Sequence, residues 1–419
     1  MQDILKNKDF INLFLGRLIT NIGDSIYVVI TMWLVYELTK NPIYTGLASA
    51  ITYIPQAFQF LMGPFIDRWN IKLILIYTQL IEFILVACIP IAYYLNVLNA
   101  WMVIVVMFAA SLLGQISYPA QTATLPKILK EDELAHGNAI MSFAYQGVDF
   151  IFIGMSGILI INFGVMDLFI ADCITFLMAA ILFTKIKFTN RKEMGNLDQE
   201  QQRENKTHYY KRELIEGIQF VKNSFIPKLL IPIIIANALF GMLTAILPNY
   251  TISRGGPEYY GYYLAALSIG MLLGSLIGAQ VKNQPIGIVI ILTTSVSACL
   301  WALSYFINQA IVSLVLFGCA NLSIGIIQVI LFTMYQTLVP ENILGRVLTV
   351  INSISIIVMP LSAFLGGYLA YILGTNYMFL SGSIGLFFIS VYFMVNPELR
   401  SMPSYKKIKP EKYILTKVS

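Results

Sequence analysis

The sequence predicts an all-α membrane protein in which twelve transmembrane helices form two repeats of six. The chain of 419 residues is 58% hydrophobic and only 12% charged, whereas soluble proteins carry about 25% charged residues. Its apolar residues gather in runs of roughly 20 or more, which is the length that crosses a bilayer. Landmarks of the first half also recur in the second half at a nearly constant offset.

Twelve apolar runs are long enough to cross a bilayer, and their boundaries are good to roughly four residues. The connections between them are mostly short, so neighbouring helices are expected to be antiparallel. The first run is too long and too polar to be the core of a signal peptide. The predicted spans are 10–38, 43–64, 72–95, 99–122, 139–163, 167–187, 229–250, 257–281, 285–306, 309–338, 347–373 and 376–396.

One long polar loop divides the spans into six and six. We therefore predict an N-terminal six-helix bundle over 1–187, a cytoplasmic linker over 188–228, a C-terminal six-helix bundle over 229–396 and a basic cytoplasmic tail over 397–419. Spaced apolar residues over 209–223 in the linker predict an amphipathic helix on the membrane surface.

The lysines and arginines predict the orientation. When the N-terminus is placed inside, all of them fall in cytoplasmic segments except Lys40, Arg254 and Arg17. Short cationic loops stay in the cytoplasm, so both termini are expected there, in a multi-pass protein of a bacterial inner or plasma membrane. The net charge of +5 reflects these loops and gives no support to a nucleic-acid partner.

The two halves repeat each other. Pro42 opens the second span in the sequence Pro-Ile-Tyr-Thr-Gly, and Pro257 opens the eighth in Pro-Glu-Tyr-Tyr-Gly. Pro126 and Pro340 end similar segments after the fourth and tenth spans, with nearly the same offset. This spacing predicts two parallel structural repeats. The glycines of the eighth span, which include Gly270, predict close helix packing.

Polar side chains recur at helical spacing on spans one, four, five, seven and ten. Because spans one, four, seven and ten are corresponding helices of the two repeats, we expect their polar side chains to line one central substrate cavity. The cavity candidates are Asn21, Tyr27, Thr31, Gln115, Tyr118, Gln146, Asn237, Thr244, Asn321, Gln328 and Tyr335.

All the acidic residues inside spans lie in the first half. A charge in hydrocarbon costs roughly 2.5–3.5 kcal/mol on insertion scales, so these side chains are expected to face protein or water. Asp24, Asp149, Glu82 and the cation Arg17 are the candidates for proton coupling. The alternative is structural pairing, for example of Arg17 with Asp24 or Asp149. Asp172, near the outer end of its span, is assigned a structural role.

Several classes of function find no support in the sequence. The cysteines lie inside apolar runs without a C-x-x-C pair, which argues against disulfides and a zinc site. No P-loop, metal cluster or Ser/His/Asp set is recognisable, so we expect no enzyme and no cofactor. The energy for transport would then come from a proton gradient. The expected partners are a small-molecule substrate, protons and the lipid bilayer, and the chain is expected to be a monomer.

The loop between the second and third spans carries the most specific motif. Gly63, Asp67, Arg68 and Lys72 resemble the loop 2–3 motif of the major facilitator superfamily, and Asn70 stands in place of its second glycine. We expect Asn70 to adopt the left-handed backbone of a tight turn, which asparagine tolerates.

Further segments are similar to the macrolide-efflux-type, drug:proton antiporter branch, near the enterobactin exporter. They are Pro119 to Pro126, Glu133-Leu134, Asn138-Ala139, Glu216-Gly217 and Val339 to Val347. The resemblance covers essentially the whole chain.

The resemblance implies alternating access about a central site. It also implies a cytoplasmic gate, in which the loop residues Gly63, Asp67, Arg68 and Lys72 act with Gly345 and Arg346 before span eleven. The chain departs from the antiporter pattern in two places. Span four lacks a membrane arginine, and the glycine-proline pair of span five is reduced to the segment Gly154 to Gly157.

The leading hypothesis is a secondary active transporter that exports amphipathic small molecules, such as macrolide-like drugs, in exchange for protons. The alternative is export of a native metabolite, such as a siderophore or lipid-like compound, in which Arg17 would bind an anionic cargo. A polytopic membrane enzyme and a non-transporting sensor are the hypotheses from other classes.

Overall fold

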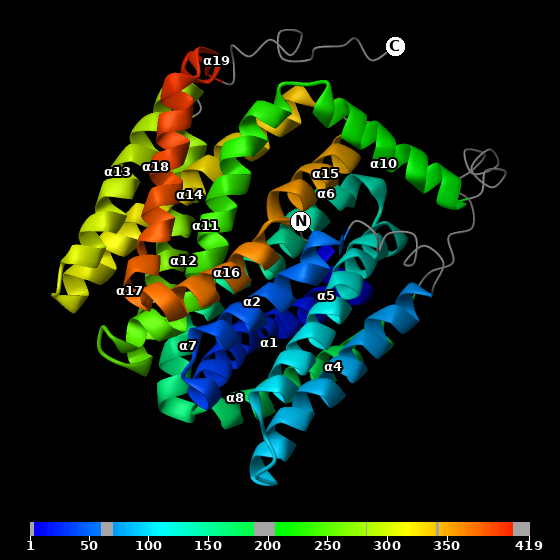
Figure 1. Ribbon diagram of the computed structural model, residues 1–419. Helices are drawn as coiled ribbons and strands as arrows, with labels where there is room; N and C mark the ends of the chain where they lie inside the picture. The colour runs from blue at the N-terminus through cyan, green and yellow to red at the C-terminus, as the bar shows by residue number, and fades with distance from the viewer. Residues whose placement is uncertain (1–3, 60–69, 188–205, 282, 341–342, 405–419) are drawn as a thin grey trace. The chain divides into compact units, whose positions relative to one another are not determined.

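The regular structure of the protein is helical throughout the residues that the computed structural model describes, which are 4–59, 70–187, 206–281, 283–340 and 343–404 (Figure 1). Helices are what long apolar runs must form in hydrocarbon, because every backbone N–H and C=O has to be paired within the segment. The chain divides into two compact units, one of residues 1–39 and 58–210 and one of residues 40–57 and 211–419.

Unit 1 is built on α1, which packs against α5, α7 and α8. Its buried apolar cluster includes Phe10, Leu75 and Phe183. The helices of unit 1 are α1 (Lys8–Thr39), α4 (Ile71–Tyr94), α5 (Ala100–Ile128), α6 (Glu131–Ser142), α7 (Val148–Phe163) and α8 (Val165–Thr184), with a π-helical turn (Phe143–Gly147) between α6 and α7.

The described part of unit 2 contains several buried clusters. One is an aliphatic cluster around Met334 and Val347, and another is a group of aromatic rings in which Phe379 contacts Tyr250 and Trp301. The helices α13, α14 and α18 lie side by side (Figure 1). The helices of unit 2 are α2 (Pro42–Ala57), α11 (Ile226–Ile252), α12 (Pro257–Gln280), α13 (Ile286–Phe306), α14 (Ala310–Leu338), α15 (Leu344–Ile356), α16 (Met359–Leu373), α17 (Thr375–Met378), α18 (Leu380–Val395) and α19 (Pro397–Arg400).

Helix α2 joins unit 2, although the sequence places it in the first bundle. It packs against α11 and α16. A Cβ atom added at Gly46 would lie 2.9 Å from the Cα atom of Gly367, so the two backbones meet directly. Glycines permit such an approach, and a single sequence does not say which helix lies on the other side. The division into two bundles of six stays a prediction.

Ten helices of the described residues are long and apolar enough to cross a membrane. The two remaining predicted spans do not form a single helix of that length. Helix α2 has 16 residues, and span five is divided between α6, the π-helical turn and α7. The count of twelve therefore stays a prediction. The amphipathic segment forms a helix as predicted, α10 (Lys206–Lys222), of which residues from Lys211 onward belong to unit 2.

Two local predictions have clear outcomes. The prediction for Asn70 is wrong, because its backbone is extended (φ −69°, ψ 111°) and its side chain caps α4 by accepting a hydrogen bond from the Lys72 amide. Asparagine favours N-caps for this reason. The prediction of close packing in span eight is confirmed, since Cβ atoms added at Gly270 and Gly274 would press on the backbone of α14.

Candidate functional site

The polar face of α1 carries an ion pair inside the membrane. Arg17 donates to the Asn21 side-chain oxygen at 2.7 Å, and its guanidinium lies 3.7 Å from the Asp24 carboxylate. The three residues follow one helical face at i, i+4 and i+7, which is why they meet. The Arg17 side chain is 13% exposed and the Asp24 side chain is 41% exposed. The pairing of Arg17 with Asp24 is therefore a feature of the structure.

Asp149 completes this network from the start of α7. Its Oδ1 atom accepts a hydrogen bond from the Asn21 amide at 3.0 Å and lies 2.5 Å from the Ser25 hydroxyl, which is also 2.6 Å from the Asn21 backbone carbonyl. Asn21 also donates to the backbone carbonyl of Tyr145 at 2.7 Å. Asn21 and Ser25 are both 2% exposed. The structure thus brings Arg17, Asn21, Asp24 and Asp149 into one network, which can change its net charge by taking up a proton.

A second row of polar contacts extends from this network through Tyr145. The Arg17 guanidinium lies over the Tyr145 ring, 4.3 Å from its centroid. The Tyr145 hydroxyl donates to Gln121 on α5 at 3.1 Å, and Gln121 donates to Ser117 at 3.1 Å. The Tyr118 ring stands edge-on to Tyr145 with centroids 4.5 Å apart.

Ser25, Tyr145 and Gln121 were not predicted as site residues. Ser25 follows Asn21 by one helical turn, so the same periodicity could have found it. The position of Tyr145 depends on the π-helical turn Phe143–Gly147. Such a turn replaces i→i+4 bonds by i→i+5 bonds and shifts the helix face by one residue. The α-helical spacing assumed for span five therefore does not hold there. The side chain of Gln146 in this turn is outside the described residues.

Glu82 of α4 and Tyr27 of α1 lie in a different place, beside α8, which packs against both helices. Glu82 is 4% exposed, and its carboxylate accepts a hydrogen bond from Gln79 at 2.7 Å. The Tyr27 ring is buried and stands edge-on to Phe169 of α8. Thr31 is fully buried and donates to the Tyr27 carbonyl at 2.6 Å. Gln115 is half-buried on α5.

The cavity candidates of unit 2 have different surroundings. Asn237 of α11 donates to the Ser355 carbonyl at 2.9 Å, and the Thr244 hydroxyl lies 3.2 Å from that of Tyr53. These residues link α11 to α15 and to α2. On α14, Gln328 is exposed, whereas Asn321 and Tyr335 are buried in the packed interior.

The predicted gate is described in part. Gly63, Asp67 and Arg68 lie outside the described residues. Lys72 donates from its ammonium group to the Ile186 carbonyl, just past the end of α8, at 2.8 Å. Gly345 lies in the first turn of α15. Arg346 forms an ion pair with Glu216 of α10 at 2.6 Å.

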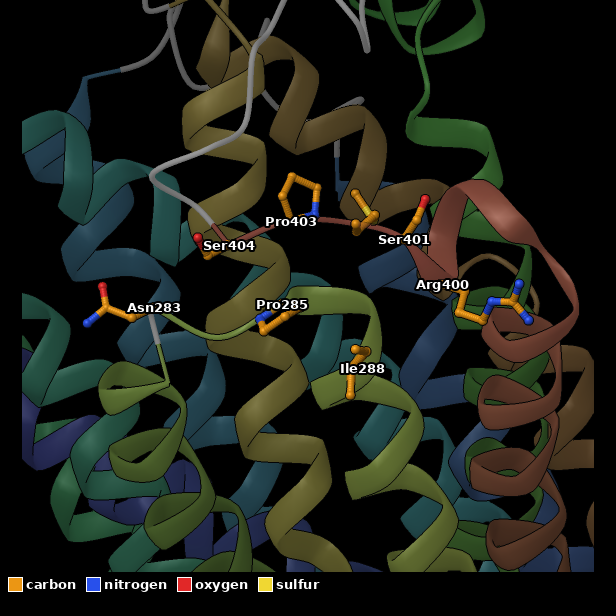
Figure 2. A pocket seen from close by; sticks show the side chains of 8 residues that line it. Asn283, Pro285, Ile288, Arg400, Ser401, Pro403 and Ser404 are labelled. Atoms are coloured by element: carbon orange, nitrogen blue, oxygen red, sulfur yellow. The ribbon is translucent and has the colours of Figure 1, made fainter.

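A surface pocket of about 280 Å³ lies elsewhere, where the segment after α18 folds over the start of α13 (Figure 2). Figure 2 shows Pro285 and Ile288 on one side and Ser401, Pro403 and Ser404 on the other. None of the predicted site residues lines it, so it is not the candidate site.

A helical membrane protein with an ion pair and carboxyl groups inside its spans has the features of a secondary transporter. The family model of the Major Facilitator Superfamily matches residues 13–363 of the chain. The chain therefore belongs to the major facilitator superfamily. It is a transporter rather than an enzyme, and a multi-pass protein of the cell membrane.

Three relatives match over most of their length. An uncharacterised transporter of this type from Bacillus subtilis, YvqJ, is 23% identical and covers 91% of this chain and 90% of its own. The multidrug efflux pump Tap of Mycolicibacterium fortuitum is 23% identical, with 91% and 93% covered. Macrolide efflux protein A of Streptococcus pyogenes is 24% identical, with 94% and 97% covered.

Solved structures agree with the fold. A D-xylose–proton symporter superimposes with a TM-score of 0.67 at 11% identity and covers 95% of this chain and 98% of its own. A bacterial homologue of the human lysosomal transporter Spinster, in an inward-facing unoccupied conformation, gives a TM-score of 0.68 at 11% identity, with 92% and 96% covered.

Proposed function

We propose that the protein exports amphipathic small molecules, such as macrolide-like drugs, in exchange for protons by alternating access. The observation that carries the proposal is the network of Arg17, Asn21, Asp24 and Asp149 inside the membrane helices of unit 1. Two carboxyl groups share one cation there. Protonation of either carboxyl changes the net charge of the network, and a charge in hydrocarbon is worth about 2.5–3.5 kcal/mol.

That free energy is enough to bias a transporter between two access states. A ligand shifts a conformational equilibrium only by its difference in binding free energy between the states. A proton bound to Asp149 or Asp24 would favour the state in which the carboxyl is least hydrated. Release on the other side would then reset the transporter. The rings of Tyr118 and Tyr145 beside this network suit an apolar or cationic cargo better than a strongly acidic one.

The named activities of two relatives support the direction of transport. One is a multidrug efflux pump and the other a macrolide efflux protein. Both are less than a quarter identical to this chain, so the cargo stays a proposal. The orientation, with both termini in the cytoplasm, likewise rests on the distribution of lysine and arginine.

The test is a deletion strain screened against a panel of macrolides, cationic dyes and siderophores, with efflux measured before and after an uncoupler. We expect the deletion strain to accumulate at least one amphipathic compound. In the parent strain, efflux of that compound should stop when the proton gradient collapses. Efflux that continues unchanged without the gradient would rule out proton coupling. Unchanged accumulation across the panel would rule out drug export.

Export of an anionic native metabolite is the second candidate. Arg17 is the cation of the network, and its buried Nε atom has no hydrogen-bond partner among the described residues. A cargo carboxylate or phenolate could accept from this donor in a conformation that exposes it. Arg17→Gln separates the two candidates. It should abolish efflux of acidic compounds if Arg17 binds them, and it should spare a cationic dye.

A further inference from the structure

The region where α8 packs against both α1 and α4 holds buried polar atoms that lie outside the Asp149 network, which is the network of Arg17, Asn21, Asp24 and Asp149. Three oxygen atoms there are buried and have no hydrogen-bond partner among the described residues: Tyr27 Oη, Gln79 Oε1 and Asp172 Oδ2. Gln79 and Asp172 are each 2% exposed and Tyr27 is 8% exposed. Buried polar atoms are almost always paired, so unpaired oxygens on three neighbouring helices mark this part of unit 1 as unusual.

Asp172 is pressed against the backbone of α1. A Cβ atom added at Gly23 would collide with the Asp172 carboxyl oxygen Oδ1 and with the Thr175 hydroxyl. Gly23 therefore gives α8 room to bring its carboxyl beside Asp24. This contact is well enclosed, since Asp172 belongs to the buried face of α8.

The hydrogen bonds of Thr175 favour one protonation state of the Asp172 carboxyl group. The Thr175 hydroxyl lies 2.7 Å from the Asp172 backbone carbonyl and 3.3 Å from Asp172 Oδ1. A hydroxyl has one proton to donate, and the shorter contact to a carbonyl can only be a donation by Thr175. An ionised Asp172 would then have no full donor for either oxygen. A protonated Asp172 can donate from Oδ1 to the threonine oxygen, so the buried carboxyl then carries no charge, although Oδ2 still has no hydrogen-bond partner among the described residues.

A second buried carboxyl stands nearby without a cation of its own. Glu82 lies within electrostatic reach of Asp172, Asp24 and Arg17, while the Arg17 guanidinium already pairs with Asp24. Two ionised carboxylates buried together would repel each other and lose their hydration, a combination that proteins avoid by holding a proton.

The other ionisable groups around this place supply no compensating positive charge. Helix α8 adds Cys173 and α4 adds Cys88. Asp149 of α7 is engaged by Ser25. The basic residue of α5 is Lys127 in the last turn of that helix.

We propose that Asp172 and Glu82 form a second proton-binding site between α1, α4 and α8, in which Asp172 is held as the neutral acid at neutral pH. Asp24, a member of the network with Asp149, couples the two sites electrostatically, since its charge acts on Asp149 as well as on Glu82 and Asp172. The bound proton keeps α8 closely packed on α1 at Gly23. The proposal does not require that the protein be an exporter.

A proton fits this site better than a metal ion. The Gln79 amide N–H points at Glu82 Oε2, so that oxygen faces a hydrogen-bond donor. In the part of the chain that the structure describes, no group of three acidic, histidine or cysteine side chains has the arrangement of a metal site.

The experiment is infrared spectroscopy of the full-length protein in lipid nanodiscs, at neutral pH and without substrate. Wild type should show the carbonyl stretch of a buried carboxylic acid. Asp172→Asn should remove a component of that band which Asp149→Asn leaves in place. Thr175→Val should shift the same component, because it removes the acceptor of the acid proton. Identical bands in wild type and Asp172→Asn would overturn the proposal.

Thermal unfolding adds a readout that does not depend on any one variant. If the folded state holds one more proton than the unfolded state, the folding equilibrium constant should fall by about tenfold for each pH unit above neutrality. Glu82→Gln and Asp172→Asn should flatten this dependence, whereas Asp167→Asn at the start of α8 should not. The infrared experiment also tests for a sodium ion. A carboxylic-acid carbonyl band that appears only when sodium chloride is replaced by potassium chloride would show a sodium site instead and overturn the proposal.

Discussion

The two units of the molecule place different chemistry inside the membrane. Unit 1 carries an ion pair and several carboxyl groups on α1, α4, α7 and α8, and these groups interact through Asp24 and Arg17. Unit 2 has no Asp or Glu in the middle of its spans. Its helices instead meet through glycines, amides and hydroxyls, as at Gly274 against α14 and at Tyr53 against Thr244.

This difference separates two requirements of a coupled transporter. Ionisable groups can convert a proton gradient into a change of conformation, because protonation changes the cost of their burial. Closely packed glycines hold helices at a fixed distance and respond little to pH. We therefore expect energy coupling to depend on unit 1 and the packing of the helices to dominate unit 2. Substitutions in each unit test whether coupling and packing are divided in this way.

The largest effect is expected in unit 1, from Asp24→Asn combined with Asp149→Asn. The change leaves Arg17 without a carboxylate and removes the groups that take up the proton. The lost bias of about 2.5–3.5 kcal/mol corresponds to about a hundredfold fall in proton-driven efflux. The measurement is dye efflux from proteoliposomes with an imposed pH gradient.

Its control is Asp167→Asn, an exposed acid in the first turn of α8. That variant should retain full efflux. Full efflux in the double variant would place energy coupling outside this network and would end the contrast between the units.

The next largest effect is expected in unit 2, from Gly274→Ala. The added methyl would strike the Leu322 backbone carbonyl on α14, and overpacking of this kind costs about 1–3 kcal/mol. Gly114→Ala is the matched control, because nothing lies within 4 Å of a Cβ atom added there. In that open helical position alanine should stabilise by about 0.5–1 kcal/mol. Thermal melting in detergent measures both.

If Gly274→Ala has the melting temperature of wild type, close packing at the glycines does not stabilise unit 2. If the variant has a lower melting temperature but transports with a normal dependence on the proton gradient, the difference between the two units is supported. Packing and coupling are then separate properties of the two units.

A smaller effect is expected from Tyr53→Phe in α2. The change removes the hydroxyl that lies 3.2 Å from Thr244, and a neutral hydrogen bond of this kind is worth about 0.5–1.5 kcal/mol. The expected result is a change of about 2–10-fold in the concentration for half-maximal transport, by the same conversion of free energy. Thr244→Val should give a similar shift, and the double variant should add little. Additive effects would show that the two side chains do not interact.

Sequence patterns predicted most of the helices and the pairing of Arg17 with Asp24 on α1, because both depend on local spacing. The apolar runs mark the spans, and the i, i+4, i+7 spacing of Arg17, Asn21 and Asp24 on one helix brings these side chains together. The role of Tyr145 was missed because a π-helical turn changes the face of span five. The place of α2 beside α16 was missed because a glycine permits contact without naming its partner.

The smallest effect is expected at Arg346, which the sequence assigns to the cytoplasmic gate. In the structure it forms an ion pair with Glu216 of α10 at 2.6 Å, and the two side chains are 30% and 44% exposed. Exposed ion pairs contribute about 0–1 kcal/mol, so Glu216→Gln should barely change the melting temperature. Glu398→Gln is the matched control, since it breaks the exposed ion pair with Lys228.

If Arg346 also serves the gate, Glu216→Gln should alter the efflux rate by a few-fold while Glu398→Gln does not, because a pair worth under about 1 kcal/mol shifts an equilibrium by no more than about fivefold. A hundredfold loss of efflux in Glu216→Gln would place a group essential for coupling in unit 2. That result would contradict the expectation that energy coupling depends on unit 1.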